Sequence, residues 1–186
     1  MKLHSIILSL SILLIAQTAF AQCGSSKSKH HASHSWSHHD DLVDVVSNNE
    51  NFGTLTVALK TAGLVSTLQK EGPFTVFAPS NAAFDKLPDG TVEGLLKPES
   101  KGQLTKILTY HVVEGTFYAK DLINAIQNSN GQYQIKTVSG GRLTASLRGS
   151  TVIITDETGA RTAVLQTDVN ASNGVAHVID SVLLPK

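Results

Sequence analysis

The sequence predicts an α+β domain in which several short helices precede a small antiparallel β-sandwich. Two observations lead to this fold class. Apolar residues recur at three- and four-residue steps from about residue 40 to residue 108, whereas short β-branched runs separated by glycines dominate the remainder. No strand-helix-strand alternation links the two halves, which argues against a doubly wound parallel sheet.

Short amphipathic helices are expected in the first half. Asp40 or Asp41 is placed to cap the first helix, and Gly63 to end the second, because glycine adopts a positive φ without steric cost. Pro98 divides a later helical segment into two. The expected buried stripes are Leu42, Val45 and Val46; Phe52, Leu55, Leu59 and Ala62; Leu64, Val65 and Leu68; Ala83, Phe84 and Leu87; and Leu95, Leu96, Leu104, Ile107 and Leu108.

One strand is expected among the helices, and strands are expected to dominate after residue 108. Aromatic and β-branched residues are concentrated in these segments, and Gly140-Gly141, Arg148-Gly149 and Thr158-Gly159 supply turns between neighbouring strands. The strand candidates are residues 74–78, 110–113, 134–138, 143–147, 152–155, 163–169 and 175–184.

The amino terminus has the pattern of a signal peptide. Lys2 precedes an apolar run over residues 6–16, which is too short to span a bilayer, and Ala19-Phe20-Ala21 is a small-x-small cleavage pattern. We therefore expect residues 1–21 to be removed and the protein to be exported, either to the extracellular space or to a periplasm or cell envelope. No later apolar run reaches transmembrane length.

Cys23 is the only cysteine, so no disulfide can form within the chain. Its position after the apolar run, followed by Gly24, also fits a lipid-modified anchor. Gln22 argues against that reading, because lipoprotein peptidases favour a small residue directly before the cysteine.

Residues 22–39 form a Ser/Lys/His-rich segment that is expected to be a flexible linker, because its composition offers almost nothing to bury. Imidazole is a ligand for zinc and copper, so the segment is a candidate metal-binding tract. The alternative is a solvated spacer, since interchangeable ligands do not define a fixed site. The candidate ligands are His30, His31, His34, His38 and His39.

Charge and motifs exclude several function classes. Fifteen basic residues balance fifteen acidic ones, so there is no overall basic field for nucleic acid. The sequence contains no nucleophile elbow, paired-histidine zinc motif, P-loop or dinucleotide-binding glycine motif. We therefore expect a protein that is not an enzyme.

Three ordered blocks carry a family resemblance: Phe74-Thr75-Val76-Phe77-Ala78-Pro79-Ser80-Asn81-Ala82-Ala83-Phe84, Leu108-Thr109-Tyr110-His111-Val112-Val113-Glu114-Gly115, and the segment from Asn173 to Pro185. They resemble the signature blocks of fasciclin domains, and the resemblance covers residues 40–186. It implies a wedge of short helices packed on a seven-stranded antiparallel β-sandwich. It also implies an adhesion module rather than an enzyme.

The resemblance further implies partner-binding residues. In matrix members of the family, an Asp-Ile pair and the Tyr-His block are implicated in integrin recognition; the matching positions are Asp168-Val169 and Tyr110-His111. The alternative for each of these residues is a purely structural role. Tyr110 or His111 is expected to bury its ring with the polar tip bonded to backbone, and Asp168 to cap its own loop. His177 is expected to be a hydrogen-bonded core residue.

These observations predict a secreted module for cell adhesion or extracellular matrix binding. The expected partner is an extracellular protein or polysaccharide, either in the matrix or as a cell-surface receptor. Two alternatives remain: a metal-binding envelope protein that uses the histidine tract, and a carrier of a small apolar ligand held between helices and sandwich.

Overall fold

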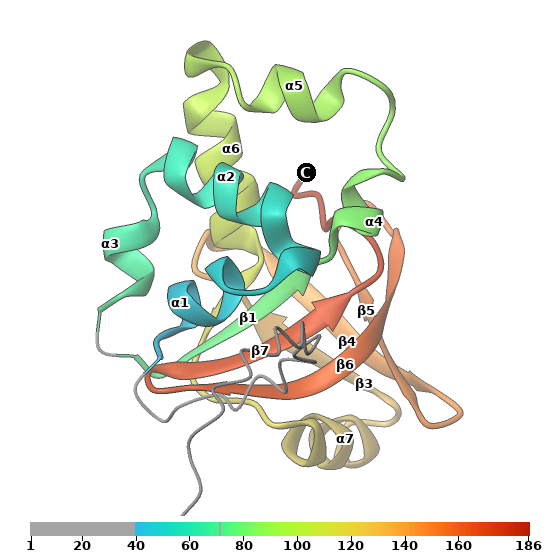
Figure 1. Ribbon diagram of the computed structural model, residues 1–186. Coiled ribbons are helices and arrows are strands. Elements are labelled where there is room, and N and C mark those ends of the chain that lie inside the picture. Colours follow the sequence, from blue (N-terminus) through green and yellow to red (C-terminus); the bar gives the residue numbers. More distant parts are fainter. Residues whose placement is uncertain (1–39, 71) are drawn as a thin grey trace, which may run out of the picture. The chain divides into compact units, whose positions relative to one another are not determined.

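The computed structural model describes residues 40–70 and 72–186 (Figure 1). The leader, Cys23 and the five tract histidines lie outside the described residues. The α-helices are α1 (Leu42–Ser47), α2 (Gly53–Ala62), α3 (Val65–Leu68), α4 (Asn81–Phe84), α5 (Thr91–Leu95), α6 (Lys101–Tyr110) and α7 (Ala119–Asn128), with 3₁₀ turns η1 (Glu50–Phe52) and η2 (Pro98–Ser100). The strands are β1 (Phe74–Pro79), β2 (Val112–Glu114), β3 (Gln132–Lys136), β4 (Arg142–Arg148), β5 (Thr151–Thr155), β6 (Arg161–Ala171) and β7 (Gly174–Ile179).

The strands form one seven-stranded sheet in the order β2-β1-β7-β6-β5-β4-β3. The predicted α+β class with seven strands is confirmed, and the sheet is mostly antiparallel. The exception is the pair β1 and β7, which runs parallel over Phe74–Pro79. A bridge between Val113 and Thr137 connects β2 to the residue after β3, so the two ends of the sheet meet.

The core lies on both faces of β1 and β7, which are buried along almost their whole length. One face, with Val76 and Val178, packs against α1, α2, α3 and α6. The other, with Phe77 and Ile179, packs against the inner residues of β3–β6 and against α7. Each large apolar side chain buried in this way contributes about 1.5–3 kcal/mol. In Figure 1, α7 lies below the strands and apart from the other helices.

Local signals explain the helix ends that position the strands. The Asp41 carboxylate accepts hydrogen bonds from the amides of Val43 at 2.8 Å and Asp44 at 2.9 Å, which confirms it as the first cap. Gly63 ends α2 with a φ of 73°, as expected.

No helix in residues 40–70 or 72–186 is long and apolar enough to cross a membrane.

Three expectations about elements were wrong. Helix α7 was not expected, although Leu122 and Ile126 lie four residues apart and are both fully buried. Tyr110 ends α6 rather than starting a strand. The last strand stops at Ile179, and the amides of Leu183 and Leu184 bond to side chains instead of to a neighbouring strand: the Leu183 amide donates to His111 Nε2 at 3.0 Å.

Candidate functional site

The turn between β6 and β7 holds three separate segments together through Asn173. Its Oδ1 accepts a hydrogen bond from the Leu42 amide at 2.9 Å, and its Nδ2 donates to the carbonyls of Leu68 at 2.6 Å and Lys70 at 3.2 Å. The next residue must be glycine, because a Cβ at Gly174 would overlap the Phe74 carbonyl oxygen. Asn173 therefore fixes the start of β7 against α1 and the end of α3.

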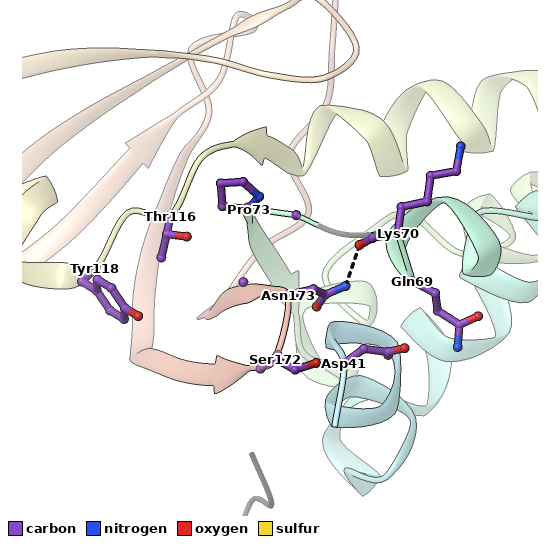
Figure 2. Close-up of a pocket in the computed structure, with 11 residues that line it drawn as sticks. Asp41, Gln69, Lys70, Pro73, Thr116, Tyr118, Ser172 and Asn173 are labelled. Atoms are coloured by element: carbon purple, nitrogen blue, oxygen red, sulfur yellow. Dashed lines mark hydrogen bonds between the residues drawn. The ribbon is translucent and has the colours of Figure 1, made fainter. Parts of the chain in front are cut away.

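A surface cleft of about 600 Å³ opens beside this turn (Figure 2). We call it the β7 cleft. Figure 2 shows Thr116 and Tyr118 on one side, with Gln69, Lys70 and Asp41 on the other and Asn173 between them. Its lining residues are Asp41, Gln69, Lys70, Gly72, Pro73, Thr116, Tyr118, Ala171, Ser172, Asn173 and Gly174.

Tyr118 is the exposed aromatic residue of this cleft, with 44% of its surface accessible. It directly precedes α7, and its position depends on how that helix begins. The Asp168 carboxylate accepts a hydrogen bond from the amide of Ala119, the first residue of α7, at 2.8 Å. A carboxylate at a helix N-terminus satisfies a free amide and opposes the positive end of the helix dipole. Asp168 therefore positions Tyr118.

Asp168 reaches α7 because β6 is irregular at this point. The register with β7 shifts between Gln166 and Val169, and Asp168 has a φ of 58°. Such a bulge redirects a side chain out of the ordinary strand alternation. Asp168 thus caps α7, whereas its expected structural role was to cap its own loop. Its neighbour Val169 is buried, with 6% of its surface accessible, among residues that face the helices.

Tyr110 is fully buried, and its phenol joins two turns of the sheet. The hydroxyl donates to the Arg142 carbonyl at 2.9 Å and accepts from the Glu157 amide at 3.1 Å. Burial raises the pKa of Tyr110 to about 12, although the Glu157 amide opposes that shift. Tyr110 thus has the expected structural role, with a buried ring and a polar tip bonded to backbone.

His111 is also buried, with 2% of its surface accessible. Its Nδ1 lies 2.8 Å from the Ile107 carbonyl, and its Nε2 accepts from the Leu183 amide at 3.0 Å, which assigns the proton to Nδ1. Burial lowers the pKa of His111 to about 4, against the opposing effects of the Ile107 carbonyl and of Asp156. The ring connects α6 to the end of the chain.

His177 lies on β7 and connects the bulge to the segment before α7. Its Nδ1 accepts from the Asp168 amide at 3.3 Å, and its Nε2 lies 2.7 Å from the Phe117 carbonyl. Burial lowers its pKa, while the Phe117 carbonyl and Asp168 act in the opposite direction. His177 is the hydrogen-bonded core residue that was expected. Both described histidines thus have both ring nitrogens engaged with backbone groups.

The four residues predicted to bind a partner therefore do not form one surface. Tyr110, His111 and Val169 face the interior, and only Asp168 is partly exposed. Most residues of the β7 cleft were not predicted, because they come from segments distant in sequence. The exception is the Asn173-Gly174 turn, whose sequence is a turn signal. Within residues 40–70 and 72–186, no three His, Cys, Asp or Glu side chains lie together as a metal site.

The sequence and the fold of this chain are similar to those of known proteins. The fasciclin domain model matches residues 50–185. The chain is 49% identical over 144 residues to protein sll1483 of Synechocystis sp., covering 77% of this chain and 73% of that protein. It is 35% identical over 151 residues to immunogenic protein MPT70 of Mycobacterium tuberculosis, covering 78% of this chain and 69% of that protein.

Two further relatives connect the chain with animal proteins. Transforming growth factor-beta-induced protein ig-h3 of Sus scrofa is 35% identical over 144 residues, covering 77% of this chain and 19% of that protein. A solved FAS1 domain pair from the insect cell adhesion molecule fasciclin I has the same fold, with a TM-score of 0.70 at 20% identity, over 78% of this chain and 51% of that one. From the matched model and these relatives, the chain belongs to the fasciclin domain family.

Proposed function

We propose that this chain is a noncatalytic, exported adhesion module that binds an extracellular protein, in the matrix or on a cell surface, through the β7 cleft. Fasciclin domains are adhesion-related modules, and the name of one solved relative identifies it as a cell adhesion molecule. The main support for this proposal is Tyr118, an exposed tyrosine at the edge of the cleft whose position is fixed by the contact of Asp168 with α7. Tyrosine is enriched among the residues that dominate binding energy at protein interfaces.

The chemistry of the cleft supports a protein ligand. Side-chain hydroxyls and an amide from Thr116, Ser172 and Gln69 line the same cleft as Tyr118, together with Gly72 and Gly174. Protein interfaces combine an aromatic anchor with a polar rim of this kind. A noncatalytic role is supported by His111 and His177, whose ring nitrogens are already engaged with backbone groups rather than free for proton transfer.

The test is adhesion of cells and of matrix proteins to surfaces coated with the purified chain. Tyr118→Ala should weaken binding by about thirtyfold, the effect of losing roughly 2 kcal/mol at an interface anchor. Leu165→Ala is the matched control, because Leu165 is a large apolar residue with 62% of its surface exposed on β6 and outside the cleft. Equal losses in the two variants, or no adhesion by the wild type, would contradict the proposal.

Export is proposed from the leader over residues 1–21, and one relative is named as a cell surface glycolipoprotein. Intact mass spectrometry of the protein from its native source distinguishes the two forms. A chain that begins at Gln22 means release, whereas a diacylated Cys23 as first residue means a lipid anchor. A chain that retains residues 1–21 would contradict export by this leader.

Metal binding by the histidine tract is a second candidate function, favoured by five histidines within ten residues, 30–39. Equilibrium dialysis with zinc or copper tests it. Replacing all five histidines with asparagine should abolish binding, while replacing His111 and His177 should leave the stoichiometry unchanged. Unaltered affinity after the fivefold replacement would refute the role of the tract.

A further inference from the structure

A second surface, separate from the β7 cleft, lies on the outer faces of β3, β4, β5 and the first part of β6. Burial alternates along most of these strands: Leu143 and Ala145 of β4 face the interior, and Thr144 between them is partly accessible. The strand register aligns the outward residues in rows. One row is Gln134, Thr144, Thr155 and Arg161; the next is Gln132, Ser146, Ile153 and Ala163. We call these residues, with Lys136, Arg142 and Arg148, the outer sheet face.

All three arginines of the 186-residue chain lie on this face, although the chain has fifteen basic residues in all. Arg142 and Arg148 are the two ends of β4, so they are separated by about 20 Å at 3.4 Å per residue. Arg161 pairs with Thr155 and therefore lies two strands away from the middle of β4. Arginine, unlike lysine, offers a planar fork of donors that matches a carboxylate or sulfate.

No arginine side chain of the described residues lies within 4.0 Å of a carboxylate, although Glu157 Oε1 accepts a hydrogen bond from the Arg142 amide at 3.0 Å. Strands β3, β4 and β5 contain Lys136, Arg142 and Arg148 but no Asp or Glu. Asp180 borders the face, but its carboxylate lies 3.0 Å from Lys86 Nζ and accepts the Ala163 amide at 2.9 Å. In the described part of the chain, the Lys86–Asp180 pair is the one ion pair within 4.0 Å.

The face is also hollowed rather than flat. A depression of about 780 Å³ is lined by ten residues, among which Arg148 and Arg161 supply the positive charge. Hydroxyls and an amide supply neutral donors and acceptors between them. The lining consists of Gln132, Thr144, Ser146, Leu147, Arg148, Ile153, Thr155, Arg161, Ala163 and Asp180.

We propose that the outer sheet face binds an acidic polysaccharide. The arginines would each take a carboxylate or sulfate of the polymer, while Thr144, Ser146 and Gln132 exchange hydrogen bonds with sugar hydroxyls. Nucleic acid fits less well, because the described residues that line the depression include no aromatic side chain on which a base could stack. A bilayer surface fits less well too, since it cannot enter a depression.

This surface shares none of its lining residues with the β7 cleft, so the two proposals fail independently. Binding at the cleft requires Tyr118, whereas binding at the outer sheet face requires the arginines. A module with both surfaces could hold a protein receptor and a matrix polymer at the same time.

The test is a titration of residues 22–186 with heparin, with polygalacturonate and with neutral dextran, at about pH 8 and with a chelator present. These conditions keep the tract histidines neutral and free of metal. Arg148→Gln/Arg161→Gln should weaken binding to one or both acidic polymers at least tenfold. Arg148→Lys/Arg161→Lys should recover only part of the loss, because it restores charge without the fork. The control is Lys97→Gln/Lys120→Gln, which removes the same charge from exposed positions on the helical part of the chain.

Dextran should not bind, and Tyr118→Ala should leave polymer binding unchanged. Three results would overturn the proposal: no binding of either acidic polymer by the wild type, equal losses in the arginine and lysine variants, or equal or tighter binding to single-stranded DNA or to anionic phosphatidylserine vesicles. Circular dichroism of each variant verifies that a loss of binding is not a loss of fold.

Discussion

Acidification should destabilise this domain through His111, by an amount that follows from its burial. The ring has 2% of its surface accessible, and its pKa falls from 6.5 in an unfolded chain to about 4 in the native one. Because the pKa of His111 is lower in the native state than in the unfolded chain, only the unfolded chain binds a proton at this residue between the two pKa values. The stability that neutral His111 provides is therefore complete above about pH 6.5 and is lost as pH falls towards about 4.

The magnitude can be worked out from that shift. At pH 4.5, two units below the pKa of the unfolded chain, protonation of the unfolded state lowers the free energy of unfolding by about 2.7 kcal/mol, at 1.36 kcal/mol per unit. Slight protonation of the native state reduces this loss to about 2.5 kcal/mol. This is a large part of the 5–15 kcal/mol typical of a domain. Near pH 7.5, His111 makes the free energy of unfolding almost independent of pH as far as its own titration is concerned.

The assay is urea unfolding followed by circular dichroism at several pH values, in the wild type and in His111→Gln. Glutamine retains an acceptor for the Leu183 amide but does not titrate, so its own cost is a constant offset. Groups that do not interact with His111 contribute equally in both proteins and cancel in the difference. The wild type should lose about 2.5 kcal/mol more than the variant between pH 7.5 and 4.5. Parallel stability curves would refute the assignment of a neutral, buried His111.

Substitutions at Tyr110, Asp168 and Gly174 test further contacts that build the domain, each by urea unfolding near pH 7. Tyr110→Phe should cost about 1 kcal/mol, because it removes the hydroxyl that bonds the Glu157 amide and the Arg142 carbonyl; a change under 0.5 kcal/mol would contradict that role. Asp168→Ala should cost about 1 kcal/mol through loss of the α7 cap, and Asp168→Asn distinctly less; equal costs would argue against capping. Gly174→Ala should cost about 3 kcal/mol or more from backbone overlap, whereas Gly102→Ala, which meets open space in α6, should stabilise the helix by roughly 0.5–1 kcal/mol.

Local patterns were enough to predict most of the secondary structure, and the exceptions have physical causes. Strands β4 and β5 alternate cleanly and have glycine turns, so their limits were predicted to within one residue. Helix α7 was hidden because the surrounding sequence reads as strands and turns. The parallel pairing of β1 with β7 joins segments about 100 residues apart, and no local signal encodes such a contact.

Three of the four residues predicted to bind a partner are buried, for a related reason. Tyr110 and His111 are distinctive in sequence, yet the fold uses their polar atoms to join α6 to the sheet and to the end of the chain. Side chains that a binding surface needs are ordinary ones, and they become a site only when the register brings them together. In the proposed outer sheet face, Arg142, Arg148 and Arg161 are separated along the chain but share one face of the sheet.

The two regions of the sheet differ in how their strands are buried, and this difference bears on both proposed binding surfaces. Strands β1 and β7 are buried on both faces and hold the helices, so substitutions there affect stability first. Strands β3, β4 and β5 bury one face only, and their outward residues are free to change without disturbing the core. The β7 cleft lies at the β6–β7 turn, beside Tyr118 directly before α7, and the position of Tyr118 depends on the Asp168 bulge. We therefore expect changes on the outer sheet face to alter binding with little effect on unfolding, and changes at the bulge to alter both.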